Sequence, residues 1–214
     1  MPQVLVVAEA KNGEVRKPTL ELLSFARSRD LPVEVALIGS GVSAQADLLA
    51  GQGASRVYLA DDPSLAIYNT AQYTSLVQDA AVQSGATQIW LTSSEMGRDL
   101  TPRLAARLGV GALSDVTSLE IEGDKITVNR PCMATKLEQQ CRFTREGMRV
   151  VSIRAGFYEA QEASPSSAET VTLSIPEGNP NVDVRDIQVE ESDEIELNEA
   201  SIVVSVGRGT GGTE

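Results

Sequence analysis

The residues with the clearest potential for chemistry lie between positions 93 and 108. Ser93 and Ser94 follow an apolar run at 88–92, and Arg98 comes close behind them where a helix is predicted to begin. Hydroxyl groups, a guanidinium group and the free backbone N–H groups of a helix start can together hold an anion. The segment is therefore a candidate anion-binding site.

A structural interpretation explains the same segment. Asp99 or Thr101 would cap the helix, while Arg103 and Arg107, four residues apart, would share a face that meets a partner or the solvent. The residues alone support both interpretations equally.

A second candidate lies at Gly39-Ser40-Gly41, between another predicted strand and a helix. The two glycines match half of a dinucleotide fingerprint, but no third glycine follows at the required spacing, and the strand is the second rather than the first. We therefore interpret the segment as a tight turn, with a phosphate cradle as the alternative.

The chain contains no histidine and two cysteines. The commonest general base, the commonest metal ligand and every Ser-His or Cys-His nucleophile arrangement are thereby missing. Cys132 and Cys141 are too few for a tetrahedral metal site and do not form a Cys-x-x-Cys motif. We expect two small buried side chains, the alternatives being a structural disulfide or a reactive thiol. The sequence predicts no catalytic constellation and no metal site.

The charge is strongly acidic, with 18 basic and 30 acidic residues and a net charge of −12. This charge argues against nucleic acid as a partner. Residues 176–200 hold nine acidic residues and one basic residue, Arg185, and so carry two thirds of the net charge. We interpret this segment as a solvated linker, the alternative being a surface that steers a basic partner.

The N-terminus is apolar at 4–8 but has no basic region before it. It is neither a signal peptide nor a membrane span, so we expect a cytoplasmic protein without membrane insertion.

The elements that would position these residues form four β-α units. The first of them opens with the uninterrupted apolar run at 4–8, which is typical of a strand covered on both faces of a parallel sheet. The pattern predicts an α/β fold with a doubly wound parallel sheet, whose ligands bind at the carboxyl ends of the strands. Ser43 is expected to cap the second helix. The predicted strands cover residues 4–8, 33–38, 57–60 and 88–92, and the predicted helices 18–29, 43–49, 68–83 and 99–108.

The pattern changes after Gly111. Runs at 116–121 and 126–128, separated by Gly123-Asp124, predict a hairpin. We expect the second half to be a trailing antiparallel β segment, with a solvated loop at 160–168. Its further short strands are predicted at 135–143, 150–154 and 170–175, and a new strand at 200–205. The chain then divides into an N-terminal domain at 1–175, an acidic linker at 176–199 and the first strand and glycine turn of a further domain at 200–214.

Four motifs, in order along the chain, resemble those of electron transfer flavoprotein alpha subunits. The most specific reads Gly-Arg-Asp-Leu-Thr-Pro-Arg-Leu-Ala-Ala-Arg-Leu-Gly from Gly97 to Gly109, followed by Ser114-Asp115-Val116. The others are Val4 to Ala10, Asn129-Arg130-Pro131 and Val203 to Gly209. The likeness covers nearly all of this chain, which would correspond to about the first two thirds of the family's subunit.

The resemblance implies an electron carrier rather than an enzyme, with an adenine nucleotide alpha hydrolase-like fold. In such a protein the N-terminal domain docks on a beta subunit. The heterodimer takes electrons from acyl-CoA and related dehydrogenases, as in fatty acid beta-oxidation, and passes them to a quinone oxidoreductase or another respiratory acceptor. FAD carries the redox chemistry. The resemblance also implies that most FAD contacts lie in a C-terminal domain beyond Glu214, and that AMP lies in the beta subunit.

By motif match, the resemblance assigns FAD contacts to Gly207, Arg208 and Gly209. Arg208 would lie beside the isoalloxazine, where a guanidinium group stabilises negative charge on reduced flavin. One arginine and a glycine turn cannot enclose so large a ligand, so we expect this chain alone not to hold FAD. The possible anion or subunit contacts are Ser93, Ser94, Arg98 and Arg103.

The sequence departs from the family pattern in two places. Val206 precedes Gly207 where the family usually has glycine, and residues 132–136 lack the tyrosine and glycine commonly found there. The alternative functions are a stand-alone adenine-nucleotide-binding module that uses the loop at 93–99, and a scaffold without a redox role.

Overall fold

The structure is a computed structural model that describes residues 3–123, 125–164, 166–177, 182, 202–207 and 209. Seven strands form its central sheet: β1 (Val4–Ala8), β4 (Val33–Gly39), β5 (Arg56–Asp61), β6 (Gln88–Thr92), β7 (Gly111–Val116), β11 (Arg149–Ile153) and β12 (Glu169–Thr172). Their order is β12-β5-β4-β1-β6-β11-β7, and every neighbouring pair is parallel. The predicted doubly wound parallel sheet is confirmed.

Helices cover both faces of this sheet. They are α1 (Lys17–Ser28), α2 (Ala46–Gly51), α3 (Thr70–Ser84) and α4 (Glu95–Leu108), with short 3₁₀ helices η1 (Ser43–Gln45) and η2 (Pro63–Leu65). Val4 and Val6 pack in one core with residues of α1 and α2, whereas Leu5 and Val7 pack in another with residues of α3 and α4. Because successive strand residues point to opposite faces, a strand covered on both faces must be apolar throughout.

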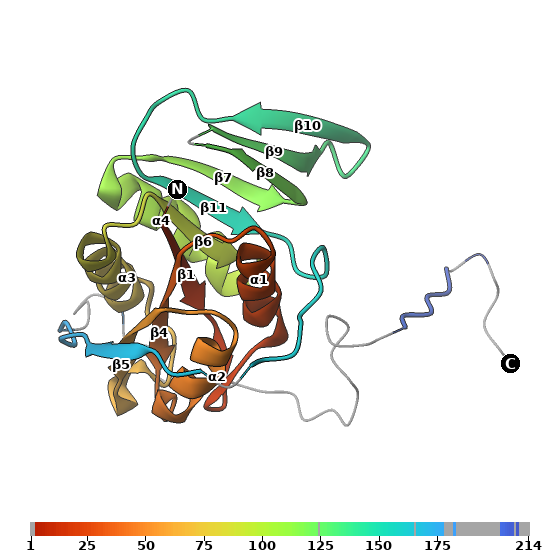
Figure 1. Cartoon of the computed structure of the whole chain (residues 1–214). Coiled ribbons are helices and arrows are strands. Elements are labelled where there is room, and N and C mark those ends of the chain that lie inside the picture. Colours follow the sequence, from red (N-terminus) through yellow and green to blue (C-terminus); the bar gives the residue numbers. More distant parts are fainter. Residues whose placement is uncertain are drawn as a thin grey trace, which may run out of the picture.

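A second, antiparallel sheet has the order β10-β9-β8. It consists of β8 (Ser118–Glu122), β9 (Lys125–Cys132) and β10 (Leu137–Arg142), and Figure 1 shows it beside β7 and β11. Leu119, Ile126 and Val128 anchor it in the core on the α1 side. The predicted hairpin is therefore confirmed. A two-residue ladder, β2 (Ala10–Lys11) with β3 (Glu14–Val15), follows β1.

The prediction of an antiparallel second half is wrong for the strands predicted at 150–154 and 170–175, and the start of the hairpin also differs. β11 lies between β6 and β7 in the parallel sheet, β12 lies beside β5 at the other edge, and Val116 ends β7 instead of opening the hairpin. All five residues of β11 are buried, which its position between two parallel neighbours explains. The apolar pattern identifies a strand, but the long connections decide which strand it pairs with.

The predicted helix starts also need correction. α4 begins at Glu95, four residues before the expected Asp99, because Ser94 rather than Asp99 or Thr101 is its N-cap. Pro102 lies inside this helix, although proline is usually found in a first turn. Ser43 does not cap α2, because it is the first residue of η1.

Several predictions concern the C-terminal segment. Within the predicted strand at 200–205, the described residues 202–205 are not assigned to a strand, and a strand forms only where a neighbouring strand supplies its hydrogen bonds. Most of the predicted linker at 176–199 lies outside the described residues. Among the helices that the structure describes, none has the length and apolar character needed to cross a membrane.

Candidate functional site

The candidate site lies at the carboxyl edge of the parallel sheet. The chain runs from β1 to β4 and β5 on one side and then returns to β6 on the other side of β1. The strand order thus reverses between β1 and β6, which is where doubly wound sheets bind ligands. Glu9 follows β1 and Ser93 follows β6, so both residues border this point.

The carboxylate of Glu9 holds the start of α4. Its Oε1 accepts a hydrogen bond from the Thr92 hydroxyl and another, at 2.5 Å, from the Ser94 hydroxyl. The Ser94 oxygen in turn accepts a hydrogen bond from the backbone N–H of Gly97 at 3.0 Å. Glu9 is only 6% exposed. A carboxylate of the chain itself therefore occupies the position beside this helix N-terminus.

Gly97 allows α4 to approach β6 this closely. A Cβ atom at this position would lie 1.7 Å from the backbone oxygen of Thr92, far inside van der Waals contact. The site therefore requires glycine at position 97 for space rather than for backbone freedom.

A second carboxylate of the chain, that of Asp61 at the end of β5, lies beside the turn that follows β4. Asp61 accepts hydrogen bonds from the backbone N–H groups of Gly41 at 2.6 Å and Ser43 at 2.8 Å. Burial acts to raise the pKa of Asp61, but the hydrogen bonds from Ser43, Gly41 and Val42 outweigh it and keep the pKa below its ordinary value. The segment Gly39-Ser40-Gly41 is thus a tight turn, as interpreted from the sequence, whose amide groups bind Asp61.

An aspartate–arginine pair lies farther along the same edge. Arg154 donates two hydrogen bonds to Asp115, from Nε to Oδ1 at 2.9 Å and from Nη2 to Oδ2 at 2.6 Å. The backbone N–H of Asp115 donates to the Ser152 hydroxyl at 3.3 Å, and the Ser93 hydroxyl donates to the same oxygen at 3.1 Å. Ser93 is therefore linked to Asp115 through Ser152.

Two further arginines complete what we call the arginine cluster, namely Arg98, Arg130 and Arg154 around Asp115. The hydrogen bonds from Arg154 are the main cause that lowers the pKa of Asp115, and the charges of Arg98 and Arg130 lower it further. The backbone N–H of Thr117 donates to the carbonyl of Asn129 at 2.9 Å, which brings the segment of Arg130 beside that of Asp115. The motifs at 97–109, 114–116 and 129–131 thus meet in space.

The sequence interpretation found Ser93, Ser94 and Arg98 but missed the roles of Glu9, Asp115 and Arg154. The structure places Ser93, Ser94 and Arg98 at the carboxyl edge of the parallel sheet. Arg103 is exposed on α4, but it lies five residues after Arg98 and therefore about 140° around the helix from it. No local spacing relates Glu9 to Ser94 or Asp115 to Arg154. Only the motif resemblance singled out Asp115, and it assigned no contact to this residue.

The remaining sequence candidates are less constrained. Gly207 and Gly209 are described, but Arg208 lies outside the described residues, so the FAD contact at Arg208 stays a prediction. Cys132 and Cys141 are free and half-buried. They face Leu137 and Val128 in the β9–β10 ladder, so about 13 Å of strand separates them, too far for a disulfide. Among the described residues, no group of three or more possible metal ligands occurs.

Comparison with known proteins identifies relatives of this chain. An electron transfer flavoprotein alpha subunit of Bacillus subtilis is 30% identical over 212 residues, covering 97% of this chain and 64% of the relative. Protein FixB of Clostridium saccharobutylicum is 31% identical over 219 residues, covering 99% of this chain and 65% of that relative. The acryloyl-CoA reductase electron transfer subunit beta of Anaerotignum propionicum is 26% identical, covering 96% of this chain and 65% of that relative.

The chain therefore spans a little under two thirds of the length of these relatives. Among solved structures, the Streptomyces glycosyltransferase SsfS6 has a TM-score of 0.32 and 15% identity, covering 56% of this chain and 41% of that one, which is too weak to support an argument. The electron transfer flavoprotein domain, in contrast, matches residues 4–177. This chain belongs to the electron transfer flavoprotein family.

Proposed function

We propose that this chain is the N-terminal part of an electron transfer flavoprotein alpha subunit and that it docks on a beta subunit. The observation that carries the proposal is the match of 97–99% of this chain to relatives that include a named alpha subunit, of which it covers 64–65%. In the whole protein, the heterodimer accepts electrons from dehydrogenases of the acyl-CoA type and delivers them to a quinone oxidoreductase or another respiratory acceptor. A relative named as an electron transfer subunit of acryloyl-CoA reductase supports a partner enzyme that acts on acyl-CoA compounds.

FAD carries the electrons in this proposal, and Gly207 and Gly209 are the described residues of the expected FAD contact. A Cβ atom added at Gly207 or Gly209 would have nothing within 4 Å, so neither glycine lines a closed cradle. We therefore assign this chain a supporting role: Gly207, Arg208 and Gly209 contribute one edge of an FAD site that the rest of the subunit encloses. AMP is assigned to the beta subunit, and the heterodimer to the cytoplasm.

The carboxylates of Glu9 and Asp61 support docking on a beta subunit over the nucleotide-binding alternative. Glu9 and Asp61 fill the two positions where a domain of this architecture would bind phosphate, at the start of α4 and at the turn after β4. A phosphate group at either position would meet a carboxylate and be repelled. In this proposal the domain therefore provides a surface for docking on the beta subunit and does not bind a nucleotide.

We assign the arginine cluster to that surface. Arg98 is exposed, and the Arg154 side chain retains 34% of its exposure despite its pair with Asp115. Three arginines around one aspartate leave a local positive charge in a chain of net charge −12. Such a patch orients an approaching acidic surface, so we propose that Arg98 contacts the beta subunit together with Ser93 and Ser94. We propose Arg103, which lies on a different face of α4, as a further contact with the same subunit.

A binding experiment with a beta subunit from the same genome tests the proposal. We expect residues 1–214 to form a one-to-one complex in analytical size exclusion while remaining colourless, and the full-length gene product with the beta subunit to show flavin absorption. Stoichiometric flavin bound to residues 1–214 alone would overturn the assignment of FAD. If no complex forms and AMP or ATP instead raises the melting temperature, the nucleotide-binding alternative replaces the proposal.

A further inference from the structure

A cavity of about 390 Å³ lies at the opposite, amino edge of the parallel sheet. It is formed where α4 ends, where β7 and β11 begin, and by the loop that leads from β10 to β11. Its volume is within the range of cavities that bind small molecules, about 300–1,000 Å³. None of the residues of the proposed docking site lines it.

The charge of this cavity is positive. Arg142, Arg145 and Arg149 line it, and Glu146 is the only acidic residue among its lining residues. Arg142 and Arg145 are exposed, whereas Arg149 is only 9% exposed. In an acidic protein, a recess lined by arginines concentrates anions locally.

Phe143 gives the cavity a fixed apolar wall. The guanidinium carbon of Arg149 lies 5.9 Å from the centroid of the Phe143 ring, in a cation–π arrangement. A Cβ atom at Gly111 would lie 3.2 Å from the ring, so the ring packs directly on the backbone there. Val110 and Met148 add further apolar lining. Arg149 is thus held beside an apolar surface, and a guanidinium group can bind a carboxylate or phosphate through two parallel hydrogen bonds.

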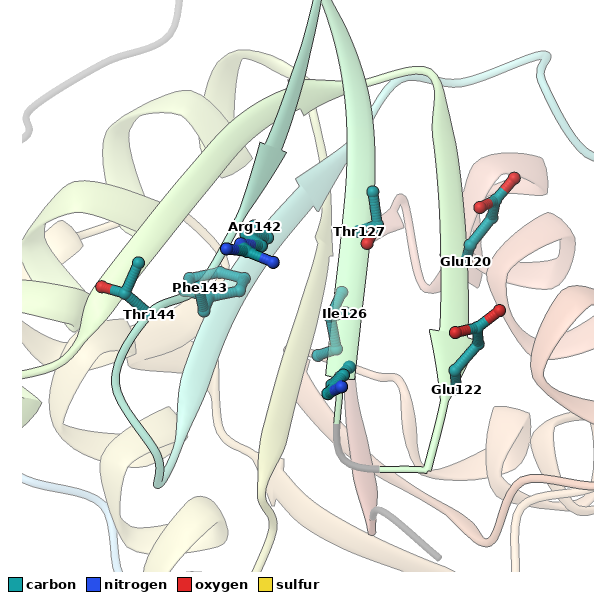
Figure 2. Close-up of a pocket in the computed structure, with 8 residues that line it drawn as sticks. Glu120, Glu122, Ile126, Thr127, Arg142, Phe143 and Thr144 are labelled. Atoms are coloured by element: carbon teal, nitrogen blue, oxygen red, sulfur yellow. The ribbon is translucent and has the colours of Figure 1, made fainter.

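A second cavity, of about 470 Å³, adjoins the first and shares Arg142, Phe143 and Thr144 with it. Figure 2 shows Arg142 and Phe143 on one side of this second cavity and Glu120 and Glu122 on the other, carried by β8. These two carboxylates offset the charges of Lys125 and Arg142, which line the same cavity. The first cavity, lined by three arginines and one glutamate, is therefore the more favourable of the two for an anionic group.

We propose that the cavity at Arg142, Phe143, Arg145 and Arg149 binds a small organic anion, with a carboxylate or phosphate group on the arginines and a short apolar body against Phe143. The proposal is independent of the proposed docking on a beta subunit, because the cavity lies at the other edge of the sheet. Its test uses residues 1–214 alone.

Phenyl phosphate is a suitable probe because it combines a dianion with an apolar ring. Isothermal titration calorimetry is expected to show one saturable site, with inorganic phosphate at least fivefold weaker and benzyl alcohol without binding. The double variant R142Q/R145Q is expected to bind phenyl phosphate at least tenfold more weakly. The control K17Q/R29Q removes the same charge from two exposed residues, one at the start of α1 and one at its C-cap, and is expected to bind as the unmodified chain does.

The side-chain Nε–H signals of the arginines provide a second readout that needs no variant. Saturable shifts of the Arg149 and Arg145 signals, with an unchanged Arg107 signal, support the proposal. Absence of saturable binding, or equal weakening in R142Q/R145Q and K17Q/R29Q, overturns it. Equal affinity for inorganic phosphate and phenyl phosphate overturns the role of Phe143.

Discussion

The carboxylate of Glu9 accepts a hydrogen bond from the hydroxyl of Ser94 at 2.5 Å, across the point where the strand order of the sheet reverses. Glu9 follows the first strand and Ser94 caps α4, so one contact joins two segments that lie 85 residues apart. A position that binds ligands in many doubly wound sheets is here closed by the chain itself.

Replacement of Glu9 by alanine should destabilise the domain. The Thr92 and Ser94 hydroxyls would lose their acceptor, and buried hydrogen bonds to a charged group contribute about 1.5–3 kcal/mol each to stability. Because both hydrogen bonds end on the same oxygen, their contributions are not fully additive, and we expect the free energy of unfolding in urea to fall by about 2–4 kcal/mol. The variant E159Q, which changes an exposed carboxylate, should stay within about 0.5 kcal/mol of the unmodified chain. A loss below 0.5 kcal/mol for E9A would show that Glu9 does not hold α4.

Gly97 and Gly85 should differ sharply in their response to alanine. The Cβ atom of G97A would lie 1.7 Å from a backbone oxygen, so α4 must move away from β6, and we expect a loss of at least about 3 kcal/mol or failure to fold. Gly85, with φ of +62°, has nothing within 4 Å of an added Cβ, so G85A should cost only about 1 kcal/mol through the left-handed backbone. Fluorescence of Trp90, the single tryptophan and fully buried, monitors both unfolding curves. Similar losses for the two variants would contradict the packing argument.

The pair of Asp115 and Arg154 should make stability depend on pH. Because Arg154 lowers the pKa of Asp115 in the folded state, the pair contributes stability above the unfolded pKa of about 3.9, and this contribution is lost as the pH falls through the folded pKa. The Asp115 side chain is 25% exposed, so solvent screening limits the effect to about 1 kcal/mol. Asp115 has a φ of +61°, a conformation that asparagine also tolerates, so D115N removes the charge without adding strain.

Urea unfolding at pH 7, 5, 4 and 3 measures this effect. The difference in stability between the unmodified chain and D115N is expected to be largest at pH 7 and to shrink below about pH 4. A difference that stays constant over this range would exclude a charge effect of Asp115.

Arg98 should contribute to association with a beta subunit. Loss of one exposed charge is worth up to about 1 kcal/mol, so R98Q is expected to raise the Kd about two- to fivefold at low salt. The difference should diminish in 0.5 M salt, because screening weakens exposed charges. The control K17Q removes an exposed charge from α1 and should leave the Kd unchanged. An unchanged Kd for R98Q would remove the arginine cluster from the interface and leave the docking proposal itself intact.

The sequence by itself determined most of the first half of the fold. Mainly apolar runs identified β1, β4, β5 and β6, since strands covered on both faces of a parallel sheet are mainly apolar. Gly85 and Gly109, each with positive φ, marked the ends of α3 and α4. These signals are local, because they depend on the conformation of a residue and on its nearest neighbours along the chain.

Only the tertiary structure decided how distant segments meet. The sequence pattern predicts β11 and β12 as short strands. Their parallel partners, however, depend on the course of long connections, which the local sequence pattern does not reveal. The start of α4 at Glu95 depends on Ser94 being held by Glu9, and the pair of Asp115 with Arg154 depends on β7 lying beside β11. Glu9 and Ser94 are separated by 85 positions in the sequence, and Asp115 and Arg154 by 39, so each pair forms its hydrogen bonds only after folding has brought the two residues together. For this reason the sequence predicted only some of the residues of the site.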